Sequence, residues 1–75
     1  MDAALEAEFE EACKAAFAYR RKTLANSLAK HPVIGSITHD LLERARIDGS
    51  RRAEQLSVSE YEHLTRVLHE FRTTR

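Results

Sequence analysis

A run of three cations carries the clearest chemical signal in this 75-residue sequence. Neighbouring residues of a helix point about 100° apart, so three in a row cannot all face a core, and at least two must project into solvent or onto a partner. Arginine offers a planar fork to phosphate, and an aromatic ring can stack on an unpaired base. The candidate RNA-contacting residues are Arg20, Arg21, Lys22 and Tyr19, with Lys14 and Lys30 at the periphery.

The charges are segregated along the chain although they cancel in total. The sequence has 12 basic and 12 acidic residues, which gives a formal net charge of zero. Every charged residue before Lys14 is an acid, and from Lys14 to His39 the charged residues are bases. A basic face on a neutral protein can still attract phosphate, because the attraction depends on the local electrostatic field and not on the net charge. The same pattern also arises when acids and bases simply complement the dipole of a helix, so charge alone leaves both interpretations open.

The spacing of the other reactive residue types does not favour catalysis or metal binding. The histidines lie at positions 31, 39, 63 and 69, so none is three or four residues from another. The lone Cys13 lies among apolar residues, which predicts a buried, inert thiol and a reducing, cytoplasmic setting. The two glycines stand apart and form no phosphate loop, and the carboxylates of the first helix are expected on its solvent side. No apolar run has the length needed to span a bilayer, and nothing addresses the chain to a membrane.

Composition predicts an all-α chain that forms one domain over residues 1–75. Glycine and proline are scarce, with two and one respectively, while good helix formers are abundant. Asp2 is a suitable N-cap for a first amphipathic helix. Phe17, Leu24 and Leu28 keep nearly the same helical phase and are expected to anchor a core, so periodicity leaves open whether that helix continues through residues 18–21.

The rest of the chain carries start and stop signals for further helices. Proline disfavours a helical residue before it and lacks an amide hydrogen, so Pro32 ends the second segment. The segments expected are a helix over about 21–29, a helix capped by Ser36, a short turn over 51–54 capped by Ser50, and a last helix from the Ser57–Glu60 capping box. Elements this short predict a small antiparallel bundle of four to five helices.

Two motifs connect these residues to a known family. Residues 16–28 read AFAYRRKTLANSL and closely resemble the "AF-x-x-RRKTL-x-N-x-L" stretch that opens the C-terminal helical domain of the KsgA (RsmA) family of rRNA adenine N6-dimethyltransferases. Residues 47–57 read IDGSRRAEQLS and resemble that family's "GID-x-x-x-RAE-x-LS". Both occur in the right order, and the resemblance covers nearly the whole chain. The structural motif residues are Phe17, Leu24, Asn26, Leu28, Arg52 and Glu54, of which the last two are expected to fix a turn.

The resemblance implies an accessory domain that helps to seat an S-adenosylmethionine-dependent enzyme on the small ribosomal subunit. Its expected partners are small-subunit rRNA and the N-terminal methyltransferase domain. This chain has neither a glycine-rich cofactor loop nor an "NLPY"-like motif, so the resemblance implies no catalytic residue, cofactor or metal within it.

Two positions depart from the family pattern. Ala25 stands where the family often has a further basic residue. Arg46 stands where it usually has glycine, in a position suited to a left-handed helix end. Because arginine in that conformation costs about 1 kcal/mol or more, the third helix is expected to end differently.

Two other interpretations stay open. A protein-docking module would use the same cations to pack against a catalytic domain or another subunit, and would expose an apolar patch larger than a monomer normally shows. A DNA-binding helix-turn-helix is a weaker possibility, because the cations lie at a helix junction and the last helix is acidic.

Overall fold

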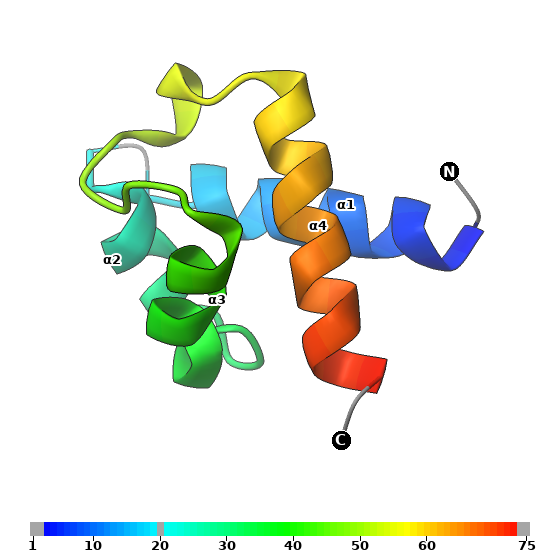
Figure 1. The fold of residues 1–75 in the computed structure, drawn as a ribbon. Helices are drawn as coiled ribbons and strands as arrows, with labels where there is room; N and C mark the ends of the chain where they lie inside the picture. The colour runs from blue at the N-terminus through cyan, green and yellow to red at the C-terminus, as the bar shows by residue number, and fades with distance from the viewer. Residues whose placement is uncertain (1–2, 20, 74–75) are drawn as a thin grey trace.

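The chain is helical, as its composition predicts. The structure, a computed structural model, describes residues 3–19 and 21–73, and the predicted cap Asp2 lies outside them. The described elements are α1 (Ala3–Phe17), α2 (Leu24–Ala29), the 3₁₀ helix η1 (Gly35–Ile37), α3 (Thr38–Ala45), the 3₁₀ helix η2 (Ala53–Gln55) and α4 (Val58–Thr73) (Figure 1). The prediction of a small all-α bundle is confirmed.

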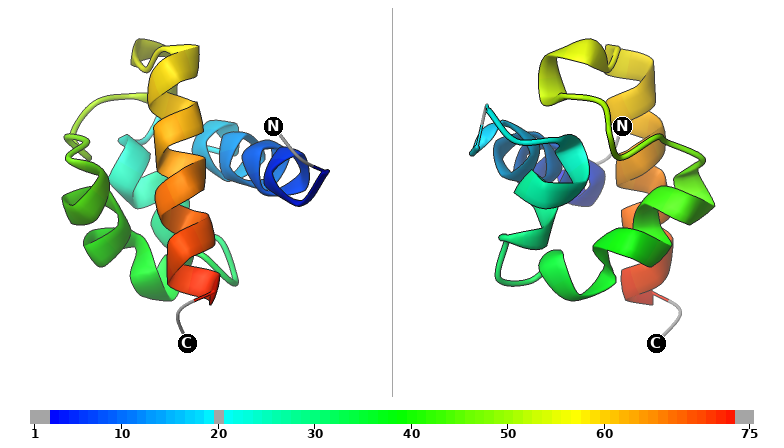
Figure 2. Two further views of the ribbon diagram at one scale, coloured as in Figure 1. Left: turned by 45° about the vertical axis from the view of Figure 1, so that its right-hand side comes forward. Right: turned by 90° about the vertical axis from the view of Figure 1, so that its left-hand side faces the viewer.

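The two long helices cross steeply, and the two short ones lie to one side of the crossing (Figures 1 and 2). The prediction of an antiparallel arrangement is therefore wrong for α1 and α4. Helices of six and eight residues are only about 9 and 12 Å long, so α2 and α3 cannot run beside the full length of α1 and α4. They fill the angle between the long helices instead. The buried face of α1 is lined by alanines, which let the crossing helix approach closely.

The core lies where the four α-helices meet. Its most deeply buried apolar side chains come from α2, α3, α4 and the segment before η1, and they are Leu24, Leu28, Ile34, Leu41, Leu64 and Leu68. Tyr61 is buried beside them, and its hydroxyl donates to the carbonyl of Ala53 at 2.5 Å. The expectation that Leu24 and Leu28 anchor the core is confirmed.

A break separates α1 from α2. Thr23 has an extended backbone with φ of −66° and ψ of 161°, and its Oγ1 accepts the amide hydrogen of Asn26 at 3.3 Å, which caps α2. The second helix thus begins three residues after the predicted start. The phase shared by Phe17 and Leu24 is lost at the break, so Phe17 is 41% exposed and its ring lies 6.0 Å from that of Tyr61. The expectation that Phe17 anchors the core is wrong.

The segment after α2 partly follows prediction. The second helix ends at Ala29, before the proline, as predicted. The Nδ1 atom of His31 then accepts the amide hydrogens of Val33 at 3.1 Å and Ile34 at 3.0 Å. No side chain caps η1 or α3, so the predicted cap at Ser36 is wrong.

Arg46 ends α3 in the left-handed conformation, with φ of 57° and ψ of 42°. The amide of the next residue, Ile47, donates to the carbonyl of Leu42 at 3.0 Å, as in a Schellman motif. Ile47 and Leu42 are both buried, and this packing offsets the backbone cost. The expectation of a different helix end is therefore wrong.

Two predictions concern residues 48 to 60. The short helical turn lies at other residues than predicted, and the capping box lies where it was predicted. Ser50 donates to the Asp48 carboxylate through its amide and its hydroxyl, at 2.9 and 2.7 Å, and caps no helix. The helical turn predicted for residues 51–54 lies instead at η2. The capping box is confirmed, since Ser57 and Glu60 exchange amide hydrogen bonds at 2.9 and 3.1 Å.

We predict that Arg46→Gly stabilises the fold. Glycine adopts the left-handed conformation at little cost, so it removes about 1 kcal/mol of strain, and part of that gain is lost to its greater freedom in the unfolded chain. The net increase in the free energy of unfolding should be below about 1 kcal/mol, measured by urea denaturation. Arg46→Ala is the matched control, since it removes the side chain and keeps the strain. An Arg46→Gly protein no more stable than the alanine variant would contradict the prediction.

Candidate nucleic-acid interface

The predicted cations lie in the turn between α1 and α2, which we call the basic turn (residues 18–23). Of these, Arg21 and Lys22 are exposed, and Tyr19 is 45% exposed. Arg20 lies outside the described residues. The described part of the turn is not helical, so Arg21 and Lys22 do not extend α1. The turn follows the end of α1 and precedes α2 (Figure 1).

Backbone hydrogen bonds hold the basic turn in place. The buried hydroxyl of Ser27 donates to the carbonyl of Ala15 at 2.6 Å and accepts from the amide of Tyr19 at 3.3 Å. The amide of Lys22 donates to the carbonyl of Tyr19 at 2.9 Å. These bonds fix the backbone from which the side chains project. A fixed backbone lowers the entropy lost when a partner binds.

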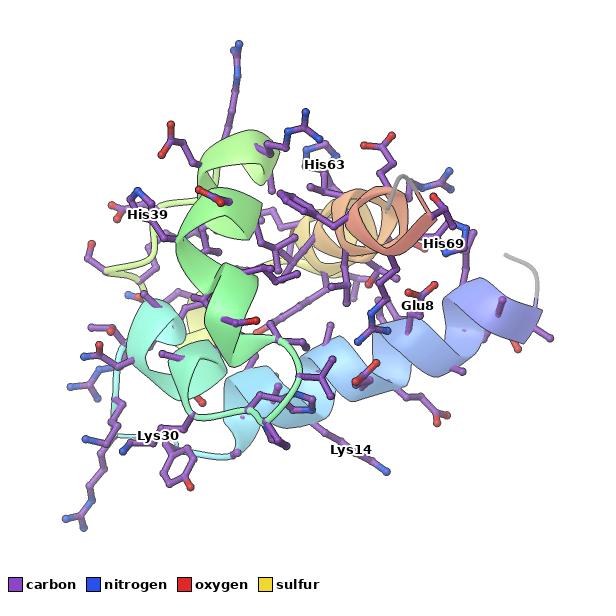
Figure 3. All side chains as sticks on the ribbon, turned by 90° about the horizontal axis from the view of Figure 1, so that it is seen from below. Glu8, Lys14, Lys30, His39, His63 and His69 are labelled. Carbon is purple, nitrogen blue, oxygen red and sulfur yellow. The ribbon has the colours of Figure 1, made fainter. Side chains whose placement is uncertain are left out.

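The two peripheral lysines lie on the same edge of the molecule (Figure 3). Lys14 comes from α1 and Lys30 from the end of α2, and both are exposed. The Nζ atom of Lys30 lies 5.5 Å from the centre of the Tyr19 ring, a cation–π contact. A hollow of about 230 Å³ lies between these three side chains.

A second chain segment runs beside the start of α2. The amide of Leu24 donates to the carbonyl of Arg51 at 2.7 Å, and the amide of Ala25 donates to that of Gly49 at 3.0 Å. The next residue, Arg52, is exposed, so this arrangement adds a cation near the basic turn from a distant part of the sequence. Leu24 and Leu28 are buried beneath this contact.

The 47–57 segment is held by contacts of Arg51 and Arg52. The side chain that ties the 47–57 segment to α4 belongs to Arg51, which had not been selected from the sequence. Its guanidinium binds both carboxylate oxygens of Glu60, at 2.5 and 3.1 Å, and also donates to the carbonyl of Gln55. Glu54 is exposed, and Arg52 contributes its amide, which donates to Gln55 Oε1 at 2.7 Å.

The acids of α1 do not all face solvent, contrary to the expectation from the sequence. Glu8 is buried, and its carboxylate contacts Nδ1 of His69 at 2.5 Å and Arg72 at 3.1 Å (Figure 3). Arg72 also forms a bidentate pair with Glu11, at 2.8 and 3.0 Å, and it lowers the pKa of that carboxyl. These contacts join α1 to α4, 61 to 64 residues apart in sequence.

The carboxylates of the described residues form ion pairs with Arg51 and Arg72 but not with the cations around the basic turn. Among the described residues, none of the candidate contact residues Lys14, Arg21, Lys22 and Lys30 forms a salt bridge. Glu11, one turn before Lys14 on α1, is engaged by Arg72 and lies 3.6 Å from Nε2 of His31. The basic turn and the lysines thus present positive charge that the fold does not neutralise.

The other reactive groups suit packing. Burial raises the pKa of the Cys13 thiol, which lowers its reactivity at neutral pH, although the side chain is only partly buried. Over residues 3–19 and 21–73, no group of three His, Cys, Asp or Glu residues could hold a metal ion.

Another hollow, of about 580 Å³, lies between α2 and α3 and does not suit a phosphate. Its rim carries the carboxylates of Glu43 and Asp48, together with Asn26 and His39. Glu43 lies 3.2 Å from Nε2 of His39. Acidic groups at the rim would repel an anion.

Comparison with known proteins assigns the family. The chain is 46% identical over 66 residues to the ribosomal RNA small subunit methyltransferase A of Myxococcus xanthus, which covers 84% of the chain and 23% of that protein. It is 51% identical over 57 residues to the protein of the same name from Desulforapulum autotrophicum, covering 73% of the chain and 20% of the relative. The Nitrosomonas europaea protein is 42% identical over 64 residues, covering 85% and 23%.

The chain belongs to the ribosomal RNA small subunit methyltransferase A family. It corresponds to the C-terminal domain of these proteins and spans less than a quarter of their length. No protein-family model matches the chain. None of its described helices has the length and apolar character needed to cross a membrane.

The two glycines lie where chain segments pack closely. A Cβ atom added to Gly35 would lie 2.4 Å from the carbonyl oxygen of Ala29, and one added to Gly49 would lie 2.8 Å from Cβ of Ala25. Both glycines therefore allow close packing of chain segments.

We predict that the Arg51–Glu60 pair stabilises the domain in a pH-dependent way. The hydrogen bond from Arg51, followed by that from the Ser57 amide, lowers the pKa of Glu60 from 4.5 to about 2. The folded state binds this proton less readily than the unfolded state, so the stabilisation is complete above pH 4.5 and is lost as the pH falls toward 2. Glu60→Gln should be less stable than the wild type at pH 7, and the two should converge near pH 2 in thermal denaturation.

Glu54→Gln is the matched control for this prediction, because Glu54 is an exposed carboxylate in the same segment. Its side chain makes no hydrogen bond or ion pair with the part of the chain that the structure describes. A constant difference in stability between wild type and Glu60→Gln from pH 7 to pH 2 would contradict the linkage.

Proposed function

We propose that this chain is the RNA-binding accessory domain of an S-adenosylmethionine-dependent rRNA adenine N6-dimethyltransferase. In this proposal the cofactor and the methyl transfer belong to the N-terminal methyltransferase domain of the parent protein. The helical domain binds small-subunit rRNA and so seats the enzyme on its substrate. The names of the relatives support an action on ribosomal RNA.

The observation that carries the proposal is that Lys14, Arg21, Lys22 and Lys30 are exposed and have no carboxylate partner among the described residues. Phosphate contacts are the main source of sequence-independent affinity for nucleic acids. In the proposed complex Arg20, Arg21 and Lys22 bind the phosphates of structured rRNA, while Lys14 and Lys30 contribute from the adjoining edge. The bonds from Ser27 and Lys22 hold the turn before RNA arrives. Because the net charge of the chain is zero, the attraction for phosphate comes from this surface and not from the molecule as a whole.

We predict weak, salt-sensitive binding to a small-subunit rRNA fragment. Three phosphate contacts give a log–log salt slope of roughly −2 to −3. Replacing Arg20, Arg21 and Lys22 by glutamate should abolish binding while leaving the helical circular dichroism unchanged. Fluorescence anisotropy at several salt concentrations measures both effects.

Arg66→Glu is the control for the charge-reversal variant. Arg66 is an exposed cation on α4, away from the basic turn in the sequence, and one charge reversal there should change affinity little. Affinity that ignores salt, or that survives the triple replacement in a folded protein, would refute the proposed RNA-binding role.

A second candidate function, docking onto a protein, is favoured by exposed apolar side chains at the end of α1 and the start of α4. Phe17 is 41% exposed where α1 ends, and Val58 is 68% exposed in the first turn of α4. The Phe17 ring contacts Tyr61, which lies one helical turn beyond Val58. Apolar groups at such a position could pack against the N-terminal methyltransferase domain.

The docking function predicts chemical-shift changes when the separately expressed N-terminal domain of the parent protein is added to the labelled chain. The sample contains no RNA, so changes centred on residues 20–22, or on Phe17 and Val58, would come from contact with the added protein domain and would support docking. Phe17→Ser should then abolish them. Val33→Ser is the control, since Val33 is a 56% exposed apolar residue in the segment after α2. An unchanged spectrum at a large excess of the domain would rule the docking function out.

A further inference from the structure

The hollow beside the basic turn has a wall suited to an aromatic ring. Its apolar lining comes from Ala15 and Ala18 at the end of α1 and from Pro32 after α2, and Tyr19 closes one side. Tyr19 keeps 45% of its surface exposed, so part of the ring is free to contact another molecule. The hollow therefore offers flat apolar surface at the edge of the cationic region.

The size of the hollow restricts what it can hold. Pockets for drug-sized molecules have volumes of about 300–1,000 Å³, and this hollow has about 230 Å³. It is too small for a whole dinucleotide or a cofactor and matches a single planar ring system. A base inside a duplex could not enter, because its faces are covered by its neighbours.

The charges at the rim suit the phosphates on either side of such a base. Lys14 and Lys30 both line the hollow and come from different helices. The ammonium group of Lys30 lies 5.5 Å from the ring centre of Tyr19. A base stacked on Tyr19 would therefore bring its phosphate close to this ammonium group. An anion at this rim meets two ammonium groups.

The backbone that carries Tyr19 is fixed on both sides. Its amide donates to Ser27 Oγ, and its carbonyl accepts from the amide of Lys22. The histidine that lines the hollow, His31, is not free to read a base edge. Its Nδ1 atom accepts two backbone amides, and its Nε2 atom faces Glu11 at 3.6 Å. The site thus has a positioned stacking surface without a base-reading group at His31, which favours stacking with little preference among the four bases.

We propose that this hollow binds one unpaired nucleobase of the RNA, stacked on Tyr19, with Lys14 and Lys30 on the flanking phosphates. This inference rests on the proposed function and deepens it. The basic turn supplies affinity for any phosphate backbone. The Tyr19 hollow selects RNA that has an unpaired nucleotide beside a helical segment. Tyr19 occupies an open position of the "AF-x-x-RRKTL" motif, so the selectivity belongs to this chain.

The test uses two RNA hairpins of equal length and the full 75-residue chain. One hairpin carries a single bulged 2-aminopurine, and the other carries the same base paired with uridine. The chain should bind the bulged hairpin about tenfold more tightly, since stacking of one base on an aromatic side chain is worth that much or more. The fluorescence of the bulged 2-aminopurine should fall on binding, and that of the paired one should not change.

Two substitutions at one position separate stacking from the rest of the binding. Tyr19→Leu should bind both hairpins with the same affinity and leave the fluorescence of the bulged base unchanged, while Tyr19→Phe should behave as the wild type. Lys30→Met should reduce the salt slope for the bulged hairpin by about one, because it removes one phosphate contact.

Each outcome decides between the two proposals. Equal affinity of the wild type for both hairpins would overturn the nucleobase site while the proposed RNA-binding role stands. A preference for the bulge that survives in a folded Tyr19→Leu protein would also overturn it. Absence of binding to either hairpin would refute both the RNA-binding role and this site.

Discussion

A buried hydroxyl at the end of α1 is the interaction on which the candidate surface depends. The last carbonyl groups of a helix have no partner within it, and the carbonyl of Ala15 would be left unsatisfied inside the bundle. Ser27, only 1% exposed, donates to this carbonyl at 2.6 Å and accepts the amide of Tyr19. One side chain on α2 therefore completes the end of α1 and sets where the chain leaves it. Tyr19 and Lys22 therefore project from backbone that these hydrogen bonds hold in place.

The distribution of salt bridges gives a neutral chain a local positive surface. Glu8 and Glu11 on α1 are held by Arg72 and His69 of α4, and Glu60 is held by Arg51. These carboxylates contribute to the packing of helices and are not available to the cations of the basic turn. Buried or half-buried pairs contribute little net stability over apolar packing, but removing one member leaves a costly charge behind. The pairing thus fixes the register of α1 against α4 and leaves Lys14, Arg21, Lys22 and Lys30 exposed without a carboxylate partner.

Local signals in the sequence predicted the local features of the fold. The Ser57–Glu60 capping box and the stop before Pro32 involve neighbouring residues, so they could be recognised without the rest of the structure. Features that depend on distant partners could not. Glu8 looked solvent-facing because its partners lie 61 and 64 residues away, and Arg46 adopts a left-handed conformation because Ile47 gains burial there. The break before Thr23 also removed Phe17 from the core, since helical phase carries no meaning across a turn.

The candidate site shows the same division between local and tertiary information. Composition identified the cations, and the motif placed them at the start of the family's helical domain. Only the fold brings Lys14, Tyr19 and Lys30 together around one hollow, because they belong to two helices separated by a turn. The few phosphate contacts that such a surface can make give weak binding by themselves. Under the proposed function, weak binding would be sufficient, because a tethered second contact acts at a high effective concentration once another domain of the same protein has engaged the RNA.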